Sequence, residues 1–362
     1  MPPPPAPPDA VPGDDGGGDD GGGDGGGGGG GDGDRAGLAR WLGHRHGTDA
    51  VAITGWELPS SGYASHTVLV EAGWPDGDGR TSRSLVLRTA PLGPGTFADY
   101  DVAAQWRAQR AAAAAGVPVA DPVLEEDPSW IGRPFVVMER IAGHLIGSVV
   151  PFDPWLASLG EADRTTVATN LFVTLARIHR ADRPGPGDVP HRDNGAELDH
   201  WEAYLDWSTG GAPVPTLTAA LGWCRAHRPG DEPGPVLLWG DVRPENLVVG
   251  DDLGVRAVLD WDMASVGAPG HDLAWFTALD ATMEHLVGRR LAGWPDRGAA
   301  VALYQRAGGG TVADLDWYET LALVRSAALM TRIGVLRRDA GLQPLLPIDD
   351  NPVLDLVRRR TT

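Results

Sequence analysis

Two polar clusters that flank a short predicted hairpin place the strongest constraint on the fold of this 362-residue chain. The first cluster runs from Asp241 to Asn246, and the second begins at Asp260. Between them, residues 247–249 and 255–259 are rich in aliphatic and β-branched side chains, and the turn sequence Gly-Asp-Asp-Leu-Gly separates them. Since a hairpin brings its two ends together, we expect Asn246 and Asp260 to lie side by side, with Asp241 one loop away.

Such a group of oxygen-bearing side chains suits a hard cation. Mg²⁺ prefers carboxylate and amide oxygens, keeps several of its waters, and is commonly bound through few side chains together with the phosphates of a nucleotide. The hairpin therefore predicts a Mg²⁺ site at Asn246 and Asp260. Each cluster also has a purely structural interpretation, because Asp, Pro and Asn favour turns and an aspartate can cap the end of an element.

Together, the two clusters resemble the motifs of a known enzyme group. Trp-Gly-Asp-Val-Arg-Pro-Glu-Asn (239–246), followed by a hairpin and Asp-Trp-Asp (260–262), is similar to the pattern of the aminoglycoside phosphotransferase and choline kinase group. Trp239 stands where that group usually has His, at a position for packing and for bracing the loop. The resemblance covers about residues 50 to 335 and is closest to the branch of small-molecule kinases associated with acyl-CoA dehydrogenases.

The resemblance implies a fold, an activity and two cofactors. The fold is an α+β, protein-kinase-like two-lobed fold, with a small antiparallel-sheet N-lobe at residues 35–143 and a larger, mainly helical C-lobe at 144–362. The activity is the ATP- and Mg²⁺-dependent transfer of a phosphoryl group to a hydroxyl of a small molecule, with hydroxyacyl compounds and antibiotics among the acceptors considered.

The same resemblance assigns roles to the polar residues around the hairpin. Asp241 is expected to orient or deprotonate the acceptor hydroxyl, and Arg243 to contact the γ-phosphate. Asn246 and Asp260 are expected to hold Mg²⁺ across the ATP phosphates. A surface or structural salt bridge is the alternative for Arg243.

A turn of small residues in the N-terminal half is a candidate nucleotide-covering loop. Ser61, Gly62 and Ser65 lie between predicted strands at 53–58 and 67–71. Such a turn lets backbone N–H groups approach phosphates. A plain hairpin explains this segment equally well.

The predicted partner of the nucleotide phosphates is an arginine, because the chain has no lysine and all 30 of its basic residues are arginine. Arg88 ends a predicted strand where the resemblance places the phosphate-binding lysine, with an exposed strand-end arginine as the alternative. Gln105, in a predicted helix at 99–115, takes the place of the paired glutamate, so we expect a hydrogen bond between Arg88 and Gln105. The resemblance also places Glu139 and Ile141 in the hinge that contacts adenine.

The C-terminal half is predicted to be helical. Apolar residues at helical spacing predict a helix over 163–180, near whose end His179 is expected to be a buried, hydrogen-bonded brace. Asp272 is expected to be an N-cap and loop brace. The helices that would build the acceptor pocket offer aromatic side chains and no dense carboxylate cluster, which favours neutral or hydrophobic acceptors over polycations. These aromatic residues are Trp201, Trp207, Trp317 and Tyr318.

The first 34 residues are rich in Pro, Gly and Asp and contain almost no apolar side chains. Such a segment cannot bury enough apolar surface to offset the entropy lost on ordering, so we expect residues 1–34 to be disordered. It carries eight of the 19 net negative charges, which leaves −11 on the rest of the chain. A body with this charge argues against nucleic acid as a partner, because phosphate contacts need clustered basic residues.

The sequence also lacks the signals of membrane insertion and secretion. It contains no run of about 18 apolar residues and no basic segment followed by an apolar one, so we expect no membrane span, no signal peptide and a cytoplasmic location. Cys224 is the single cysteine, which excludes an intramolecular disulfide and a thiolate zinc cluster. The oligomeric state is left open.

Three functions fit these observations. The first is the small-molecule kinase described above, and the second is an aminoglycoside or other antibiotic phosphotransferase, which differs only in its acceptor. The third is a nucleotide-binding pseudokinase that acts through a partner. The changed pair Arg88 and Gln105 favours the third, whereas the complete set of Asp241, Asn246 and Asp260 favours catalysis.

Overall fold

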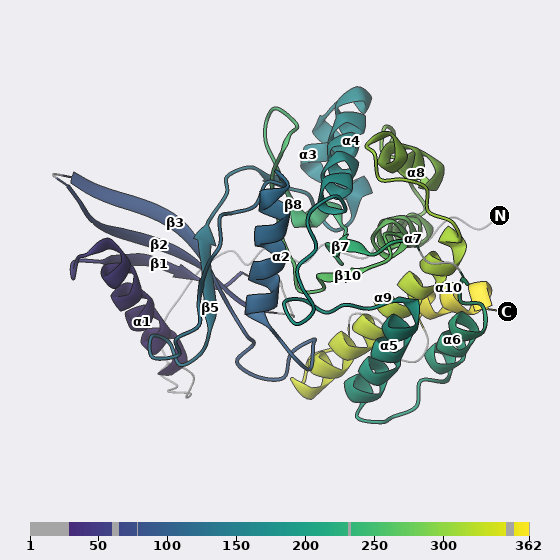
Figure 1. Cartoon of the computed structure of the whole chain (residues 1–362), viewed down its shortest axis with the longest axis horizontal. Coiled ribbons are helices and arrows are strands. Elements are labelled where there is room, and N and C mark those ends of the chain that lie inside the picture. Colours follow the sequence, from purple (N-terminus) through teal and green to yellow (C-terminus); the bar gives the residue numbers. More distant parts are fainter. Residues whose placement is uncertain (1–28, 60–64, 78, 231–232, 345–350, 362) are drawn as a thin grey trace, which may run out of the picture.

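The computed structural model describes residues 29–59, 65–77, 79–230, 233–344 and 351–361. They form a smaller lobe built on a sheet and a larger lobe built mainly of helices, which lie side by side in Figure 1. The predicted α+β, two-lobed fold with an antiparallel sheet in the smaller lobe is confirmed. None of the helices in the described residues is both long and apolar enough to cross a membrane.

The smaller lobe contains a five-stranded antiparallel sheet in the order β1-β2-β3-β5-β4. Its strands are β1 (Ala52–Glu57), β2 (His66–Asp76), β3 (Gly79–Thr89), β4 (Val123–Glu125) and β5 (Phe135–Glu139). Alternation along β5 divides the core between the two faces of the sheet, because successive side chains of a strand point to opposite sides. Phe135 and Val137 belong to one cluster of buried residues, and Val136 and Met138 to another.

A helix covers each face of this sheet. Helix α1 (Gly29–His46) packs Leu38, Trp41 and Leu42 against the cluster that contains Phe135. Helix α2 (Val102–Ala114) packs on the other face, which is turned toward the larger lobe in Figure 1. Asp101 caps α2 by accepting hydrogen bonds from two backbone N–H groups of its first turn.

The start of α1 corrects one prediction. Residues 1–34 were expected to be disordered. Residues 1–28 lie outside the described residues, but α1 begins at Gly29, and Asp34 is buried and paired with Arg133. The apolar residues Leu38, Trp41 and Leu42 anchor the helix on the sheet. Once a helix is anchored, each further residue adds one hydrogen bond at little cost, so the helix extends into the Gly- and Asp-rich segment.

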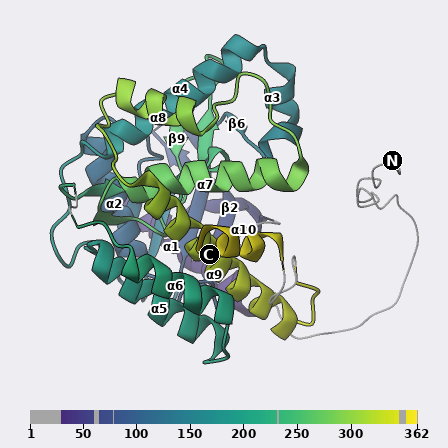
Figure 2. The ribbon, with the colours of Figure 1, turned by 90° about the vertical axis from the view of Figure 1, so that its right-hand side faces the viewer.

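The larger lobe has eight α-helices among its described residues. They are α3 (Pro154–Ser158), α4 (Glu161–Ile178), α5 (Asn194–Thr209), α6 (Pro215–Ala226), α7 (Gly270–Val287), α8 (Arg297–Arg306), α9 (Leu315–Asp339) and α10 (Pro352–Thr361). Helix α7 crosses the middle of this lobe in Figure 2, with α4 and α8 on one side and α5, α6 and α9 on the other. This central position makes α7 the element on which the site is built.

Two small antiparallel sheets and two short 3₁₀ helices complete the larger lobe. One sheet has the order β6-β8-β9 and the other pairs β7 with β10. These elements are β6 (His144–Leu145), η1 (Val150–Phe152), β7 (Val236–Leu238), η2 (Pro244–Asn246), β8 (Leu247–Val249), β9 (Val255–Val258) and β10 (Ser265–Gly267). Strands β8 and β9 form the hairpin predicted from the sequence, with Leu247 opposite Val258.

The turn into the first polar cluster requires glycine. Gly240 has a φ of +90°, which L-residues with a side chain rarely adopt. A Cβ atom there would also lie 2.2 Å from the backbone oxygen of Met263. The chain can therefore bring the loop after β7 close to the segment after β9 only with glycine at this position.

Candidate active site

Asp241 is held by two hydrogen bonds from the larger lobe. The indole Nε1–H of Trp275, on α7, donates to Oδ1 at 2.6 Å, and the amide of Asn246 donates to Oδ2 at 2.8 Å. Burial raises the pKa of Asp241 to about 6, against the opposing charge of Arg243 and with a contribution from the neighbouring Asp260. A carboxylate with a raised pKa and two fixed donors is typical of a catalytic acid or base.

Asp272 braces the backbone of the loop that carries Asp241. Its two carboxylate oxygens accept hydrogen bonds from the backbone N–H groups of Trp239 and Gly240, at 2.8 and 2.9 Å. His179 lies between Asp272 and the hydroxyl of Tyr304, at 3.0 and 2.7 Å, and all three side chains are buried. The predicted brace roles of His179 and Asp272 are confirmed, but Asp272 stands within α7 and does not cap its N-terminus.

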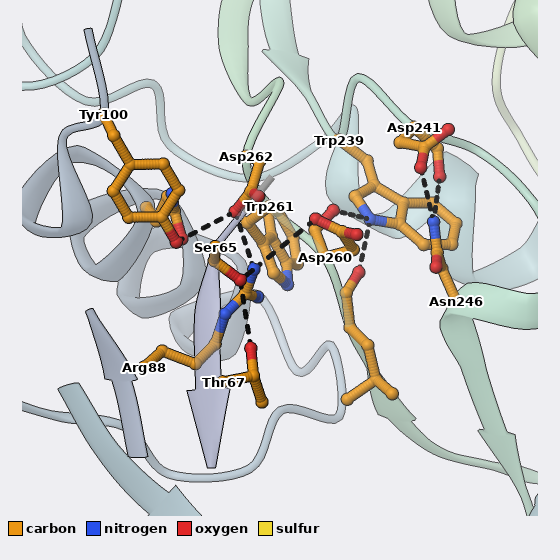
Figure 3. A network of polar contacts seen from close by, with 12 residues as sticks. Ser65, Thr67, Arg88, Tyr100, Trp239, Asp241, Asn246, Asp260, Trp261 and Asp262 are labelled. Atoms are coloured by element: carbon orange, nitrogen blue, oxygen red, sulfur yellow. Dashed lines mark hydrogen bonds and ion pairs between the residues drawn. The ribbon is translucent and has the colours of Figure 1, made fainter. Parts of the chain in front are cut away.

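Asn246 and Asp260 lie at the two open ends of the β8–β9 hairpin, as predicted. The backbone N–H of Leu259 donates to the oxygen of Asn246 at 2.8 Å, which fixes the two ends together. Figure 3 shows Asp260 between the pair Asp241–Asn246 on one side and the side chain of Arg88 on the other. Asp260 has a positive φ of 53°, a conformation that is uncommon outside glycine and that recurs at functional sites.

Arg88 crosses from the smaller lobe to the Asp-Trp-Asp segment. Its Nη2 donates to Asp262 Oδ1 at 2.8 Å and to Ser65 Oγ at 2.9 Å, and lies 3.7 Å from Asp260. The hydroxyl of Tyr100 also donates to Asp262 (Figure 3). Only 12% of the Arg88 side chain is exposed, so the alternative of a solvent-exposed strand end is wrong.

The expected hydrogen bond between Arg88 and Gln105 is also wrong. Gln105 is buried in α2 and accepts a hydrogen bond from Tyr100 at 3.3 Å. Arg88 is paired with Asp262 instead, because a carboxylate is a stronger partner for a guanidinium than an amide is. Gln105 therefore supports Tyr100 and does not line the cleft.

A cavity of about 380 Å³ lies between the lobes beside these residues. Its lining includes Ser65, Arg88, Asn246 and Asp260 at one end and the hinge after β5 at the other. The hinge lining comprises Glu139, Arg140 and Ile141. This volume is typical of a small-molecule site.

The backbone of the hinge that lines this cavity has one donor and one acceptor that the sheet does not use. The N–H groups of Glu139 and Arg140 donate to Ala120 and Ser84. No bond to the N–H of Ile141 or to the oxygen of Glu139 is found within the part of the chain that the structure describes.

Three other residues predicted for the site remain to be placed: Ser61, Gly62 and Arg243. Ser61 and Gly62 belong to the undescribed segment 60–64. Arg243 is ion-paired with Glu245 and lines a second, mostly apolar pocket together with Val242 and Pro244 of the same loop. About one third of its side chain is exposed.

Sequence reasoning missed three residues that the structure places in the site. Asp262 lies in the Asp-Trp-Asp motif, so its acidic character was visible, but its partner Arg88 is 174 residues away. Tyr100 precedes α2 and Trp275 lies one turn after Asp272 in α7. The sequence gives no signal for either residue, because the spacing of aromatic residues does not show where an indole N–H or a phenol hydroxyl points.

The residues present fit a magnesium nucleotide. Buried polar atoms are almost always hydrogen-bonded, but Asp262 Oδ2 and Arg88 Nε are buried and have no partner among the described residues. The carboxylate oxygen of Asp262 can bind a cation, and the N–H of Arg88 Nε can donate a hydrogen bond to a phosphate. No group of three or more His, Cys, Asp or Glu side chains placed to hold a metal is found in those residues, which is compatible with Mg²⁺ shared between few side chains and phosphate oxygens.

The two-lobed fold and the Asp241, Asn246 and Asp260 arrangement define a kinase-like phosphotransferase. The chain belongs to the phosphotransferase enzyme family, whose sequence profile matches residues 55–318. A candidate aminoglycoside phosphotransferase from Ralstonia eutropha has a similar structure, with a TM-score of 0.65 at 22% identity over 90% of this chain and 95% of that one. A thermostable mutant of aminoglycoside phosphotransferase APH(4)-Ia has a TM-score of 0.52 at 15% identity, over 89% and 96%. Both likenesses show the fold.

Curated relatives are longer proteins. Acyl-CoA dehydrogenase family member 11 of Gallus gallus is 29% identical over 229 residues, which are 60% of this chain and 27% of that protein. Acyl-CoA dehydrogenase family member 10 of Mus musculus is 31% identical over 204 residues, which are 53% and 18%. The match thus spans between about a fifth and about a quarter of the length of these two relatives.

Proposed function

We propose that the protein transfers the γ-phosphoryl group of Mg·ATP to a hydroxyl group of a small molecule. The observation that carries this proposal is the environment of Asp241 beside the inter-lobe cavity. Hydrogen bonds from Trp275 and Asn246 hold its carboxylate in place, and its pKa is raised. A residue that merely stabilised the loop would not need a charge that burial disfavours.

Asp241 retains the capacity to bind the acceptor. A carboxylate offers about four acceptor positions. Trp275 and Asn246 use one on each oxygen, so a hydroxyl can donate to a remaining position. Asp241 then orients the hydroxyl oxygen for attack on the phosphorus and takes up its proton as the new bond forms.

The other residues of the cavity would hold the nucleotide. Ile141 N–H and the Glu139 oxygen provide the donor and the acceptor that an adenine edge needs, and Arg88 reaches toward the phosphates from β3. Asn246 and Asp260 would hold Mg²⁺, with Asp262 as a further oxygen donor. When bound, Mg²⁺ neutralises charge on the transferred phosphoryl group.

The pseudokinase alternative is less well supported. It rested on the loss of the lysine–glutamate pair, but Arg88 is a buried cation with its own carboxylate partner. A positive group at the phosphate end of the cavity is therefore retained with a different pairing. The antibiotic phosphotransferase alternative shares every residue discussed and differs only in the acceptor.

A screen of hydroxylated metabolites and antibiotics tests the proposal. The purified protein is incubated with each compound and Mg·ATP, and products are examined by mass spectrometry for the gain of one phosphate. Asp241→Asn should abolish the gain of phosphate. The control Asp182→Asn changes an exposed aspartate that makes none of the site contacts described above, and it should leave the gain of phosphate unchanged. Nucleotide binding with no product from any compound would favour the pseudokinase.

A further inference from the structure

A further cavity lies where a loop of the smaller lobe meets two helices of the larger lobe. Its volume is about 400 Å³. One wall belongs to the loop between β3 and α2, residues 90–101, and the other is formed by Trp207 of α5 and Arg332 of α9. The lining shares no residue with that of the nucleotide cavity, so a ligand here and a nucleotide can be bound at the same time.

The side chain of Arg332 provides the positive charge of this cavity. Its guanidinium carbon lies 4.3 Å from the ring centre of Trp207, and its Nε donates to the backbone oxygen of Gly95 at 3.0 Å. These two contacts fix the plane of the guanidinium. They leave both Nη groups without a hydrogen bond, and the charge without an ion pair, among the residues that the structure describes.

The loop opposite Arg332 adds backbone donors and no negative charge. Gly93 and Gly95 line the cavity, and their N–H groups donate to no described residue. None of the residues that line the cavity is an aspartate or a glutamate. A fixed cation, unused N–H groups and the lack of a carboxylate in the lining together favour an anionic ligand.

The same loop connects the two side chains that donate to Asp262. It begins directly after β3, which carries Arg88, and Tyr100 lies near its other end. Its middle is tied to the larger lobe by the bond from Arg332 and by the hydroxyl of Tyr204, which donates to a backbone oxygen of the loop at 2.8 Å. An anion between Arg332 and the loop would strengthen this tie, and with it the contact of the smaller lobe with Asp262.

We propose that this cavity binds the carboxylate or phosphate group of a small molecule, and that the bound anion raises the affinity for the nucleotide by holding the two lobes together. The planar guanidinium offers parallel N–H donors that match either anion. Anion binding itself does not depend on the proposed function, whereas its effect on the nucleotide rests on it.

The anionic group has two possible sources, the acceptor itself and a separate regulatory molecule. The aromatic residues expected to line the acceptor pocket divide between this cavity and the core. Trp207 lines the cavity, whereas the other three are buried in the larger lobe: Trp201, Trp317 and Tyr318. Binding of the acceptor's own anionic group here would replace the expected preference for neutral acceptors by a preference for anions.

The experiment titrates inorganic phosphate and acetate into the full chain by calorimetry, with and without Mg²⁺ and AMP-PNP. The variants are Arg332→Met, Arg332→Lys and Gly93→Glu, and the controls are Gly93→Ala and Arg338→Met. Gly93 is exposed, and a Cβ atom there would meet no atom within 4 Å, so glutamate adds a carboxylate without removing a contact. Arg338 is an exposed arginine of the same helix, paired with Asp339.

Arg332→Met should weaken binding of the favoured anion about 10-fold or more, as expected for the loss of charged hydrogen bonds. Gly93→Glu should weaken it about threefold or more through repulsion of like charges. Arg332→Lys should retain part of the affinity, and both controls should stay within about twofold of the parent. In the parent, the anion and AMP-PNP should each raise the affinity for the other by the same factor, and Arg332→Met should lose this coupling.

Activity assays distinguish the two sources of the anion. If the anion belongs to the acceptor, phosphate should compete with anionic acceptors, and Arg332→Met should raise the KM for these acceptors alone. If it belongs to a separate molecule, phosphate should lower the KM for ATP with every acceptor.

Anion binding that is unchanged in both Arg332→Met and Gly93→Glu would overturn the proposal, and so would bound anion without any effect on the affinity for AMP-PNP. Because Gly93→Glu removes no contact, the anion site is tested even if Arg332→Met does not fold. If AMP-PNP does not bind, the proposed function fails, but the titrations without nucleotide still decide whether the anion site exists.

Discussion

Replacing Asp241 by asparagine should make the protein inactive and more stable at neutral pH. Asparagine has the shape of aspartate, and its oxygen can still accept the hydrogen bond from Trp275. The amide of Asn246 stays in place, because its Nδ2 also donates to the backbone oxygen of residue 241 at 3.1 Å, so its bond to the side chain is lost. The substitution therefore removes the charge of Asp241 and one hydrogen bond.

The size of the stability gain follows from the pKa of Asp241. The folded protein raises this pKa from 3.8 to about 6, which corresponds to about 3 kcal/mol of unfavourable charge for a fully buried group. Asp241 keeps part of its surface in contact with solvent, and the variant loses the hydrogen bond from Asn246. We therefore expect a gain of about 1 kcal/mol in the free energy of unfolding.

The sign of the pH dependence is fixed by the direction of that shift. An acid with a raised pKa binds its proton more tightly in the folded state, so its cost is absent below pH 4, grows between pH 4 and 6, and is complete above pH 6. Asp241→Asn should thus exceed the parent in stability at pH 7.5, and this difference should shrink toward zero as the pH falls to 4.

Urea unfolding of parent and variant across this pH range measures the effect, and steady-state assays measure activity. We expect kcat to fall about 100-fold or more, with the affinity for Mg·ATP within a few fold of the parent value. In the parent, kcat/KM should fall on the acid side with an apparent pKa near 6. A variant that turns over normally, or that is less stable than the parent at pH 7.5, would refute the reasoning.

Three further predictions concern the surroundings of Asp241. Asp260→Ala should weaken Mg·ATP binding and turnover together, and nucleotide titrations with and without Mg²⁺ would show no difference from the parent if the metal bound elsewhere. Arg88→Met should raise the KM for ATP and lower the free energy of unfolding by about 3 kcal/mol, because it leaves Asp262 buried without its counter-charge. Adding Asp262→Asn should restore resistance to urea but not the KM for ATP. An unchanged stability in the single variant would contradict the pairing of Arg88 with Asp262. Gly240→Ala should prevent accumulation of folded protein, because the new methyl group would overlap the backbone of Met263. Soluble yield and circular dichroism measure this effect. A normally folded variant would show that the turn at Gly240 is not as described.

Local features of the sequence were sufficient to predict the elements that carry the site. The hairpin at β8 and β9 was predictable, because both strands and their turn lie within one continuous stretch. The brace role of His179 was predictable because a histidine at the end of an apolar helix stripe must find partners when it is buried. The two-lobed fold was predicted from the resemblance of the motifs and is confirmed by the family match.

Partners that are distant in sequence could not be predicted. Arg88 and Asp262 are 174 residues apart, and nothing near Arg88 indicates that an aspartate of the other lobe will replace Gln105 as its partner. Asp34 was assigned to a disordered segment because composition is averaged over many residues. A single pairing with Arg133, 99 residues away, depends on the packing of α1 on the sheet, which composition does not reveal.

The polar contacts of the site divide between the two lobes. Both side chains that donate to Asp241 belong to the larger lobe, whereas both that donate to Asp262, Arg88 and Tyr100, belong to the smaller lobe. If the lobes move apart, Asp241 keeps its hydrogen bonds and Asp262 loses them. In the proposed function, the side of the site that holds the acceptor hydroxyl would keep its hydrogen bonds in an open molecule, whereas the side that holds the nucleotide would be complete only when the lobes close.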